Sequence, residues 1–122
     1  MSDYGFYVGQ LRFVANRTGR VNEEVSAMMD VLISIADQIE EKGAFTLEAI
    51  ELRLGSRALA GLAGFLQKQI LPEVVAVGNS RGEAEVRWVI DTSMALTSKL
   101  LMHAEITKDK EGLSVDLPAA PK

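Results

Sequence analysis

The side chains that could carry out nucleophilic chemistry are few, and their spacing does not bring them together. His103 is the single histidine, and the hydroxyls that precede it are those of Ser93, Thr97 and Ser98. Nucleophilic catalysis needs a serine or threonine hydroxyl within hydrogen-bond reach of such a base. On a helix, Thr97 faces away from His103. Ser98 has an unsuitable spacing, and Ser93 is too distant. We therefore interpret His103 as a half-exposed helix residue without a catalytic role.

Acidic side chains are the other candidates for proton transfer or metal binding. The closest pairs are Glu40 with Glu41 and Glu48 with Glu51. Carboxylates that are adjacent in sequence, or that lie on a helix surface, are normally solvated, so no general acid–base pair is expected here. The chain has no cysteine and only one histidine, which leaves no ligand set for zinc. We expect no enzyme activity, no metal and no cofactor.

The composition is that of a folded domain rather than a disordered chain. Of the 122 residues, 48% are apolar and 25% are charged, which is typical of a domain with its own core. The chain lacks cysteine, a basic and apolar leader, and an uncharged run of about 18 residues. These features predict a cytoplasmic protein with no membrane contact. The net charge of −4 argues against bulk electrostatic binding to nucleic acid.

Residues 4–15 are predicted to form a β-hairpin. Gly9-Gln10 provides a two-residue loop with glycine first, as a type II′ turn requires. This register pairs Phe6 with Phe13 across the two strands. A hairpin alone is not stable in water, so we expect it to cover one side of a helical core.

The strongest helix signal spans residues 22–42. Asn22 is placed to cap its start, and Gly43 is placed to end it in the left-handed conformation. Apolar residues recur at alternating intervals of four and three, which is typical of a helix with one apolar stripe. A core helix is the preferred interpretation, and a helix-pairing interface is the alternative. The interface candidates on this stripe are Val25, Met28, Leu32 and Ile35.

Two shorter helices are predicted next, at 47–54 and 57–71. Thr46 is placed to cap the first, Gly55 to end it, and Pro72 to stop the second. The second helix has an apolar face but also carries small residues, which would let another helix or backbone approach closely. These small residues are further interface candidates: Ala60, Gly61 and Gly64.

Residues 83–106 contain two competing patterns. Alternation over the seven residues from Ala84 to Ile90 favours a strand at 83–90, whereas apolar spacing from Val86 to Ala104 favours a helix. The helical pattern is the longer of the two, so one helix over 83–106 is the prediction. Trp88 is expected either in the core or, if exposed, as an interface anchor.

The chain is predicted to form one helical domain with its hairpin over residues 1–106. Residues 107–122 are polar and are expected to form a flexible C-terminal tail. The alternative is that Leu113, Val115 and Leu117 add a strand to the edge of a sheet or to a partner.

The segment from Phe45 to Leu59 resembles the helix–turn–helix of winged-helix regulators. The matching residues are Thr46, Leu47, Glu48, Ile50, Arg53, Leu54, Gly55 and Arg57. The resemblance implies a DNA-binding regulator that uses residues 46–71, with a wing at 74–90. Its DNA contacts would come from four basic residues, Arg53, Arg57, Lys68 and Arg81. The helix after the turn, however, has almost no side chain that can read a base edge.

Together these patterns predict an α-rich α+β domain, a small bundle of about four helices with an N-terminal β-hairpin. The predicted function is that of a non-catalytic protein-interaction or assembly module. We expect it to self-associate through the apolar stripe at 21–39 or through the helix at 83–106, so its partner is a protein or a second copy. The alternative function is that of a winged-helix-like regulator that binds DNA. A strand at 83–90 would favour this alternative.

Overall fold

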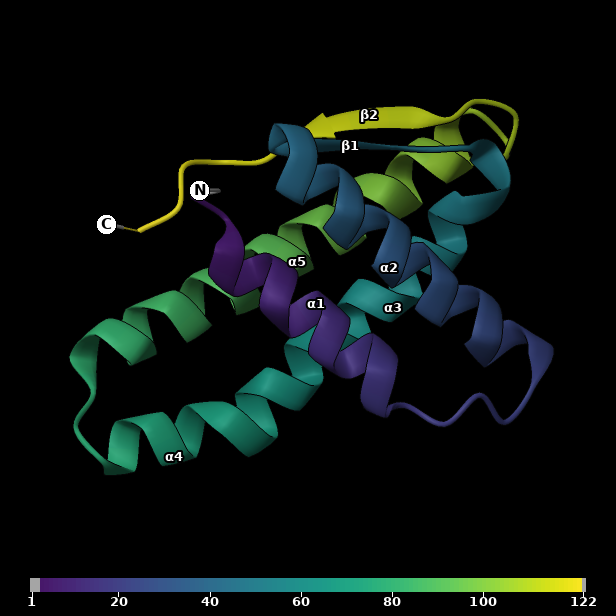
Figure 1. The fold of residues 1–122 in the computed structure, drawn as a ribbon. Coiled ribbons are helices and arrows are strands. Elements are labelled where there is room, and N and C mark those ends of the chain that lie inside the picture. Colours follow the sequence, from purple (N-terminus) through teal and green to yellow (C-terminus); the bar gives the residue numbers. More distant parts are fainter. Residues whose placement is uncertain (1–2, 122) are drawn as a thin grey trace.

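The computed structural model describes residues 3–121, in which helices surround one core and a pair of strands lies at one end (Figure 1). The elements are, in chain order, α1 (Gly5–Arg17), α2 (Glu23–Lys42), β1 (Ala44–Leu47), the 3-10 turn η1 (Ala49–Glu51), α3 (Leu52–Phe65), the π-helical segment η2 (Leu66–Ile70), α4 (Leu71–Ala76), α5 (Ser80–Ile106) and β2 (Leu113–Asp116). The α-rich α+β fold class predicted from the sequence is confirmed.

Helix α3 lies at the centre of the fold. It packs against both α5 and α2, and α1 packs on α2 (Figure 1). Three of its leucines are fully buried and lie in one core with fully buried side chains of the neighbouring helices. The largest contributors are Leu52, Leu59 and Leu62 of α3, Leu32 and Ile35 of α2, and Leu100 of α5. Burial of one such side chain stabilises the fold by about 1.5–3 kcal/mol, so this shared core fixes how the helices are arranged.

The β-hairpin predicted for residues 4–15 is wrong, because this segment is helix α1. Tyr7, Leu11 and Val14 share one helix face and are all buried. Helix α1 packs mainly on α2, and Tyr7 also meets Ser93 and Trp88 of α5. Phe13, which the hairpin would have placed on its apolar face, is 49% exposed. The burial of Tyr7, Leu11 and Val14 on one face therefore stabilises a helix here. It outweighs the strand-like alternation of residues 4–15 and the turn signal of Gly9-Gln10.

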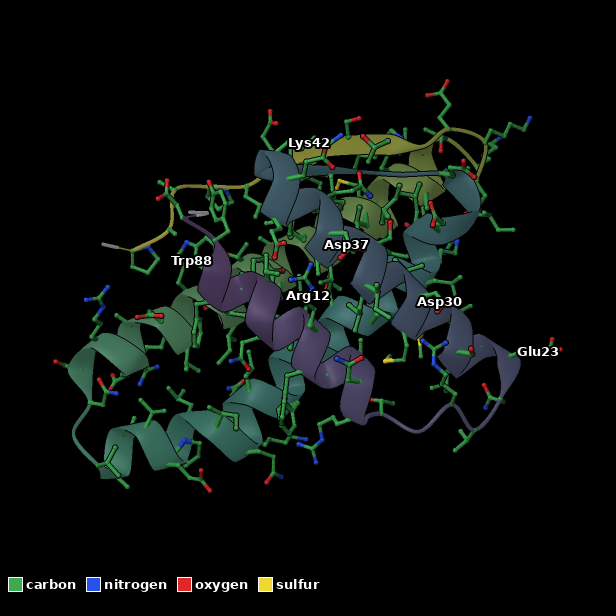
Figure 2. The ribbon with its side chains drawn as sticks, viewed as in Figure 1. Arg12, Glu23, Asp30, Asp37, Lys42 and Trp88 are labelled. Carbon is green, nitrogen blue, oxygen red and sulfur yellow. The ribbon has the colours of Figure 1, made fainter. Side chains whose placement is uncertain are left out.

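Helix α2 confirms the prediction for residues 22–42. The Asn22 side chain accepts a hydrogen bond from the Val25 N–H at 2.8 Å, and Gly43 ends the helix with φ of 69°. Arg12 of α1 reaches across to α2, where its guanidinium donates to Asp37 at 2.8 Å (Figure 2). The predicted cap and stop signals are therefore both used, and α1 is tied to the exposed side of α2.

The predicted helix 47–54 begins two residues later than expected, because Leu47 ends strand β1 and the 3-10 turn starts at Ala49. Thr46 lies inside strand β1, so no helix begins directly after it and it caps none. Phe45 and Leu47 lie on either side of it and are fully buried. Burial of every second side chain is the pattern of a strand, and here it outweighs the helix-capping pattern. Glu48 caps the chain instead, through a capping box at the 3-10 turn.

The turn predicted at Gly55 is absent, because α3 runs through this position without a break. A Cβ atom on Gly55 would lie 2.9 Å from Leu47 Cδ1, and 3.4 Å from both Leu100 Cδ1 and Val31 Cγ1. Gly55 thus allows β1 and two helices to approach α3 closely, which is a packing role rather than a turn role.

The helix predicted at 57–71 does not stop at Pro72. Helix α3 continues into η2, and Pro72 lies in the first turn of α4. A proline is tolerated at that position because the first N–H groups of a helix have no partner within it. The chain therefore stays helical up to Ala76.

Helix α5 confirms the prediction of one helix over 83–106 and rules out a strand at its start. It begins at Ser80, and the Asn79 side chain accepts from the Gly82 N–H at 2.9 Å. The wing expected at 74–90 is therefore not formed, because α4, a turn and α5 occupy that stretch.

The two strands are far apart in sequence and pair antiparallel, with Phe45 opposite Val115. Residues 107–122, for which a flexible tail was the first prediction, thus contain the strand that was the alternative. Val115 and Leu117 are buried, so the alternating apolar residues attach this segment to the core.

Candidate protein-binding surfaces

An apolar groove of about 300 Å³ lies where α1, α2 and α3 meet. Its apolar lining comes from all three helices: Val14, Met28, Met29, Ala58, Leu62 and Phe65. Pockets that hold ligands measure about 300–1,000 Å³, so this groove has room for a few side chains of a partner. Methionine is unbranched and polarizable, which suits a surface that adapts to such side chains.

Gly61 keeps part of this groove open. It lies inside α3, where glycine costs about 1 kcal/mol relative to alanine. A Cβ atom on Gly61 would meet no atom within 4 Å, so no close packing inside the described chain requires glycine there. Gly64 is equally open but does not line the groove. Gly61 therefore differs from Gly64 in one respect: its missing side chain leaves space in the lining of the groove.

The edge of the groove is basic. The guanidinium of Arg17 lies 4.7 Å from the centre of the Phe65 ring and 5.4 Å from that of Phe13. Arg57 also lines the groove and forms an ion pair with Glu24. Within residues 3–121, Arg17 takes part in no ion pair. Its charge, oriented by two aromatic rings, is therefore available to a carboxylate of a partner.

A second apolar surface runs along the outer face of α5. We call it the outer stripe and define it by Met94, Leu101, Met102 and Ile106, which are 47%, 38%, 61% and 74% exposed. Helical spacing places these side chains on one side of α5. Asp91 and Glu105 lie on the same exposed face, and Lys99 lies at its edge. Exposed apolar side chains gathered on one helix face are a feature of interaction surfaces.

The structure divides the predicted interface candidates of α2 into two groups. Leu32 and Ile35 are fully buried in the core and cannot touch a partner. Val25 and Met28 are only partly buried, and Met28 lines the groove. Of the small residues, Ala60 is partly buried on α3, next to Gly61.

Trp88 is neither a buried core residue nor a free anchor. Its indole ring is partly buried and lies against Tyr4 and Tyr7 at the start of α1. Its Nε1–H donates to the Ala119 carbonyl at 3.0 Å. Segments from both ends of the described chain therefore cover it.

The basic residues predicted to contact DNA are mostly engaged within the chain. Three of them form ion pairs with carboxylates: Arg53 with Asp109, Arg57 with Glu24 and Arg81 with Glu85. Lys68 is exposed on the π-helical segment η2. The helix–turn–helix and the wing that the regulator hypothesis requires are both missing from residues 46–90.

His103 and Ser93, two of the residues considered for catalysis, are engaged in structural hydrogen bonds. His103 Nε2 lies 2.9 Å from the Gly112 carbonyl, and the Ser93 hydroxyl bonds to that of Tyr7. Over residues 3–121, no three histidine, cysteine or acidic side chains are grouped so that they could bind a metal. None of the helices in this range has the length and hydropathy of a membrane span.

Neither Arg17 nor Phe13 was predicted from the sequence to belong to a binding site. The helix at 83–106 was predicted as an association surface, but its outer stripe was not identified. Arg17 becomes notable only because Phe65, which is distant in sequence, comes to lie beside it. The outer stripe has a local signal, since helical spacing puts more apolar residues on α5 than one core-facing side can bury. Apolar positions on both sides of a long helix are the pattern that would have revealed it.

Comparisons of the chain with protein-family models, with curated proteins and with solved structures find no match. The surfaces of the molecule are therefore the basis for a functional proposal.

Proposed function

We propose that the protein is a non-catalytic assembly module, in which the outer stripe of one copy binds the groove of the next copy. The observation that carries this proposal is the presence of two unpartnered apolar surfaces with complementary charges. At the groove edge, Arg17 has no ion pair within residues 3–121, whereas Arg57 is paired with Glu24, and the outer stripe has Asp91 and Glu105 beside it. Complementary charge of this kind orients two surfaces and suppresses wrong pairings.

The dimensions of the two surfaces support a helix-in-groove contact. Along α5, the stripe from Met94 to Ile106 is about 18 Å long. The groove, at about 300 Å³, takes side chains of such a helix rather than the whole helix. Met102 is the most exposed methionine of the stripe, and open space above Gly61 provides a place for such a side chain.

The two surfaces belong to different parts of the molecule, so the proposed contact is heterologous. Such a contact leaves one free groove and one free stripe on a dimer. Assembly therefore continues to a ring or to a longer series of copies, and does not end at a symmetric pair. The cytoplasmic location expected from the sequence remains a prediction.

The test uses two blocking variants and their mixture. Gly61→Phe fills the groove, and Met102→Lys places a charge in the stripe. Sedimentation velocity should show that the unmodified protein associates as its concentration rises into the high micromolar range, whereas each variant alone stays monomeric. Mixing the two variants should give a one-to-one dimer, because each retains the surface that the other lacks.

Two matched controls address nonspecific effects. Gly9→Phe adds the same ring at another open helix glycine, and Val77→Lys adds the same charge at another exposed apolar side chain, 76% exposed. Both controls should associate as the unmodified protein does. A strictly monomeric unmodified protein would contradict self-association. Loss of association in Met102→Lys but not in Gly61→Phe would show that α5 pairs with another α5 and would remove the groove from the proposal.

A further inference from the structure

The C-terminal segment that crosses Trp88 has a proline at each end of a four-residue stretch, Pro118-Ala119-Ala120-Pro121. The Trp88 Nε1–H donates to the Ala119 carbonyl at 3.0 Å, and the Tyr4 hydroxyl donates to the Leu117 carbonyl at 3.4 Å. Two aromatic side chains thus bind two main-chain carbonyls of one proline-rich segment.

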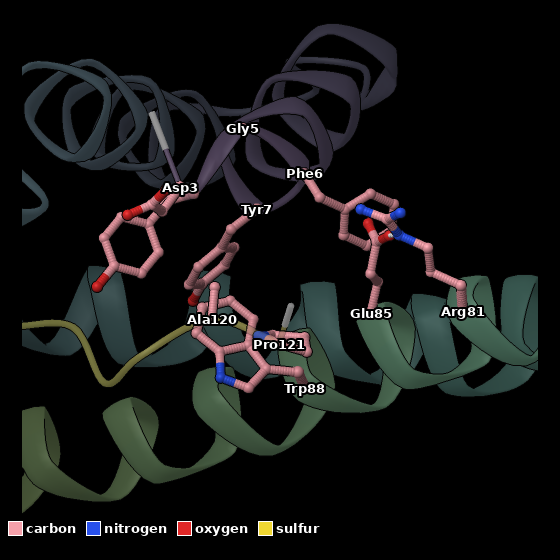
Figure 3. A pocket seen from close by; sticks show the side chains of 10 residues that line it. Asp3, Gly5, Phe6, Tyr7, Arg81, Glu85, Trp88, Ala120 and Pro121 are labelled. Carbon is pink, nitrogen blue, oxygen red and sulfur yellow. Dashed lines mark hydrogen bonds and ion pairs between the residues drawn. The ribbon is translucent and has the colours of Figure 1, made fainter. Parts of the chain in front are cut away.

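The aromatic side chains form a defined platform at the junction of α1 and α5. Tyr4 stacks on Trp88 with ring centres 6.1 Å apart, and Tyr7 meets the indole edge-on at 5.6 Å. The Tyr7 hydroxyl is anchored below by Ser93 at 2.9 Å. Figure 3 shows Ala120 and Pro121 lying at this platform, beside Tyr7 and Trp88. We call Tyr4, Tyr7 and Trp88 the aromatic platform.

The backbone chemistry of the segment suits this platform. Proline fixes its own φ near −65°, and the residue before a proline is held in extended or polyproline II backbone. Leu117 and Ala120 both precede prolines, so most of the segment is restricted in this way. A polyproline II chain has no internal hydrogen bonds, which leaves its carbonyls free to accept from side-chain donors. Aromatic surfaces are the usual partners of such segments.

The platform continues beyond the segment that lies on it. A cavity of about 170 Å³ adjoins Ala120 and Pro121 and extends between the start of α1 and the start of α5. Phe6, Arg81 and Glu85 also line this cavity. A longer ligand would therefore find an aromatic ring, a guanidinium and a carboxylate past the position of Pro121.

We propose that the aromatic platform is a binding site for proline-rich segments with the spacing Pro-x-x-Pro. The chain's own residues 118–121 are its resident ligand, and a proline-rich segment of a partner protein displaces them. Because the resident ligand is tethered, an external peptide competes with a high local concentration and binds with reduced apparent affinity. This site is separate from the groove and the outer stripe.

Trp88 is the only tryptophan and lies in the proposed site, so its fluorescence reports on the platform directly. The test uses the full chain with Pro118→Ala and Pro121→Ala combined, which weakens the resident ligand without shortening the chain. The probe is a synthetic peptide of sequence Asp-Leu-Pro-Ala-Ala-Pro, which repeats residues 116–121. The control peptide has alanine in place of both prolines.

The emission of the double variant should move to longer wavelength, because the indole becomes more exposed. The proline peptide should reverse this change with saturation, and should bind the double variant at least three times more tightly than it binds the unmodified protein. An unchanged emission, no saturable response, or an equal response to the alanine peptide would each overturn the proposal.

A second measurement covers the case in which the double variant does not fold. In the unmodified protein, the indole N–H resonance of Trp88 should shift on titration with the proline peptide to millimolar concentration and should not shift with the alanine peptide. No shift with the proline peptide would overturn the proposal. Gly61→Phe should bind the proline peptide as the unmodified protein does, which separates this site from the proposed assembly contact.

Discussion

The hydroxyl oxygens of Tyr7 and Ser93 lie 2.9 Å apart in the core and join α1 to α5. Both side chains are fully buried, so the Tyr7 hydroxyl depends on Ser93 for its hydrogen bond. The same tyrosine ring meets the edge of Trp88. One buried bond therefore fixes the position of α1 and, with it, part of the aromatic platform.

The two partners of this bond should not be equally sensitive to substitution. Ser93→Ala leaves the buried Tyr7 hydroxyl without its partner, which costs about 1–3 kcal/mol. Tyr7→Phe should cost less, because a helical serine can turn to the carbonyl four residues before it. Urea unfolding of the two single variants and of the double variant would measure the loss in the free energy of unfolding for each. The double variant should lose less than the sum of the two losses, and strict additivity would show that the bond contributes nothing.

Tyr7 should make the protein sensitive to alkaline pH. Burial raises the pKa of Tyr7 above its ordinary value of 10.0, and the hydrogen bond to Ser93 offsets this rise only in part. Because the folded-state pKa is the higher one, the stabilisation is complete below the unfolded-state pKa and is lost as the pH rises above it. We expect the free energy of unfolding to fall more steeply above about pH 10 in the unmodified protein than in Tyr7→Phe. Parallel pH profiles for the two proteins would be incompatible with a tyrosine pKa raised by burial.

Two glycines of α3 should respond in opposite directions to alanine. Gly64→Ala should raise the free energy of unfolding by up to about 1 kcal/mol, because its Cβ would meet nothing and alanine favours helix. Gly55→Ala gains the same propensity, but its Cβ would lie 2.9 Å from Leu47 Cδ1. Overpacking of this kind costs about 1–3 kcal/mol, so Gly55→Ala should be the less stable of the two. Equal stabilities in denaturant titrations would show that Leu47 moves aside without cost.

Gly112 should be needed for the strand pair. A Cβ atom there would lie 2.5 Å from the Leu47 carbonyl oxygen, a main-chain atom that cannot turn away as a side chain can. Gly112→Ala should therefore weaken the pairing of β1 with β2, by about 1–3 kcal/mol. Amide hydrogen exchange should become faster in both strands and stay unchanged in α3. Gly19→Ala is the matched control, since its Cβ would have only a contact of 3.8 Å.

The helices that could be predicted from the sequence are those with local signals at both ends. Helix α2 has Asn22 and Gly43 as its cap and stop, and α5 has a helical pattern longer than any competing one. Helix α1 has no side-chain cap, so its state depends on burial against α2, which the local sequence does not reveal. At Gly55, three contacts from distant segments explain the glycine, and a turn was the only local explanation available.

The candidate sites were predictable only in part, for a similar reason. Met28 and Gly61 were singled out separately, and the fold brings both to one groove. Arg17 gains its role from Phe65, and Trp88 from Ala119, both far away along the chain. Such pairs arise from the packing of whole helices, so no spacing rule within one helix could predict them.

The strand pair also determines the order of events during synthesis of the chain. Thr46 and Ser114, whose hydroxyls lie 2.7 Å apart across the two strands, are separated by 68 positions in the sequence. Closing so large a loop is slow and costs entropy, and β2 leaves the ribosome only after α3, α4 and α5. Until then β1 has an unpaired edge, which is open to strands of other nascent chains. The residues of β2 are thus made after the helices and then cover the free edge of the first strand.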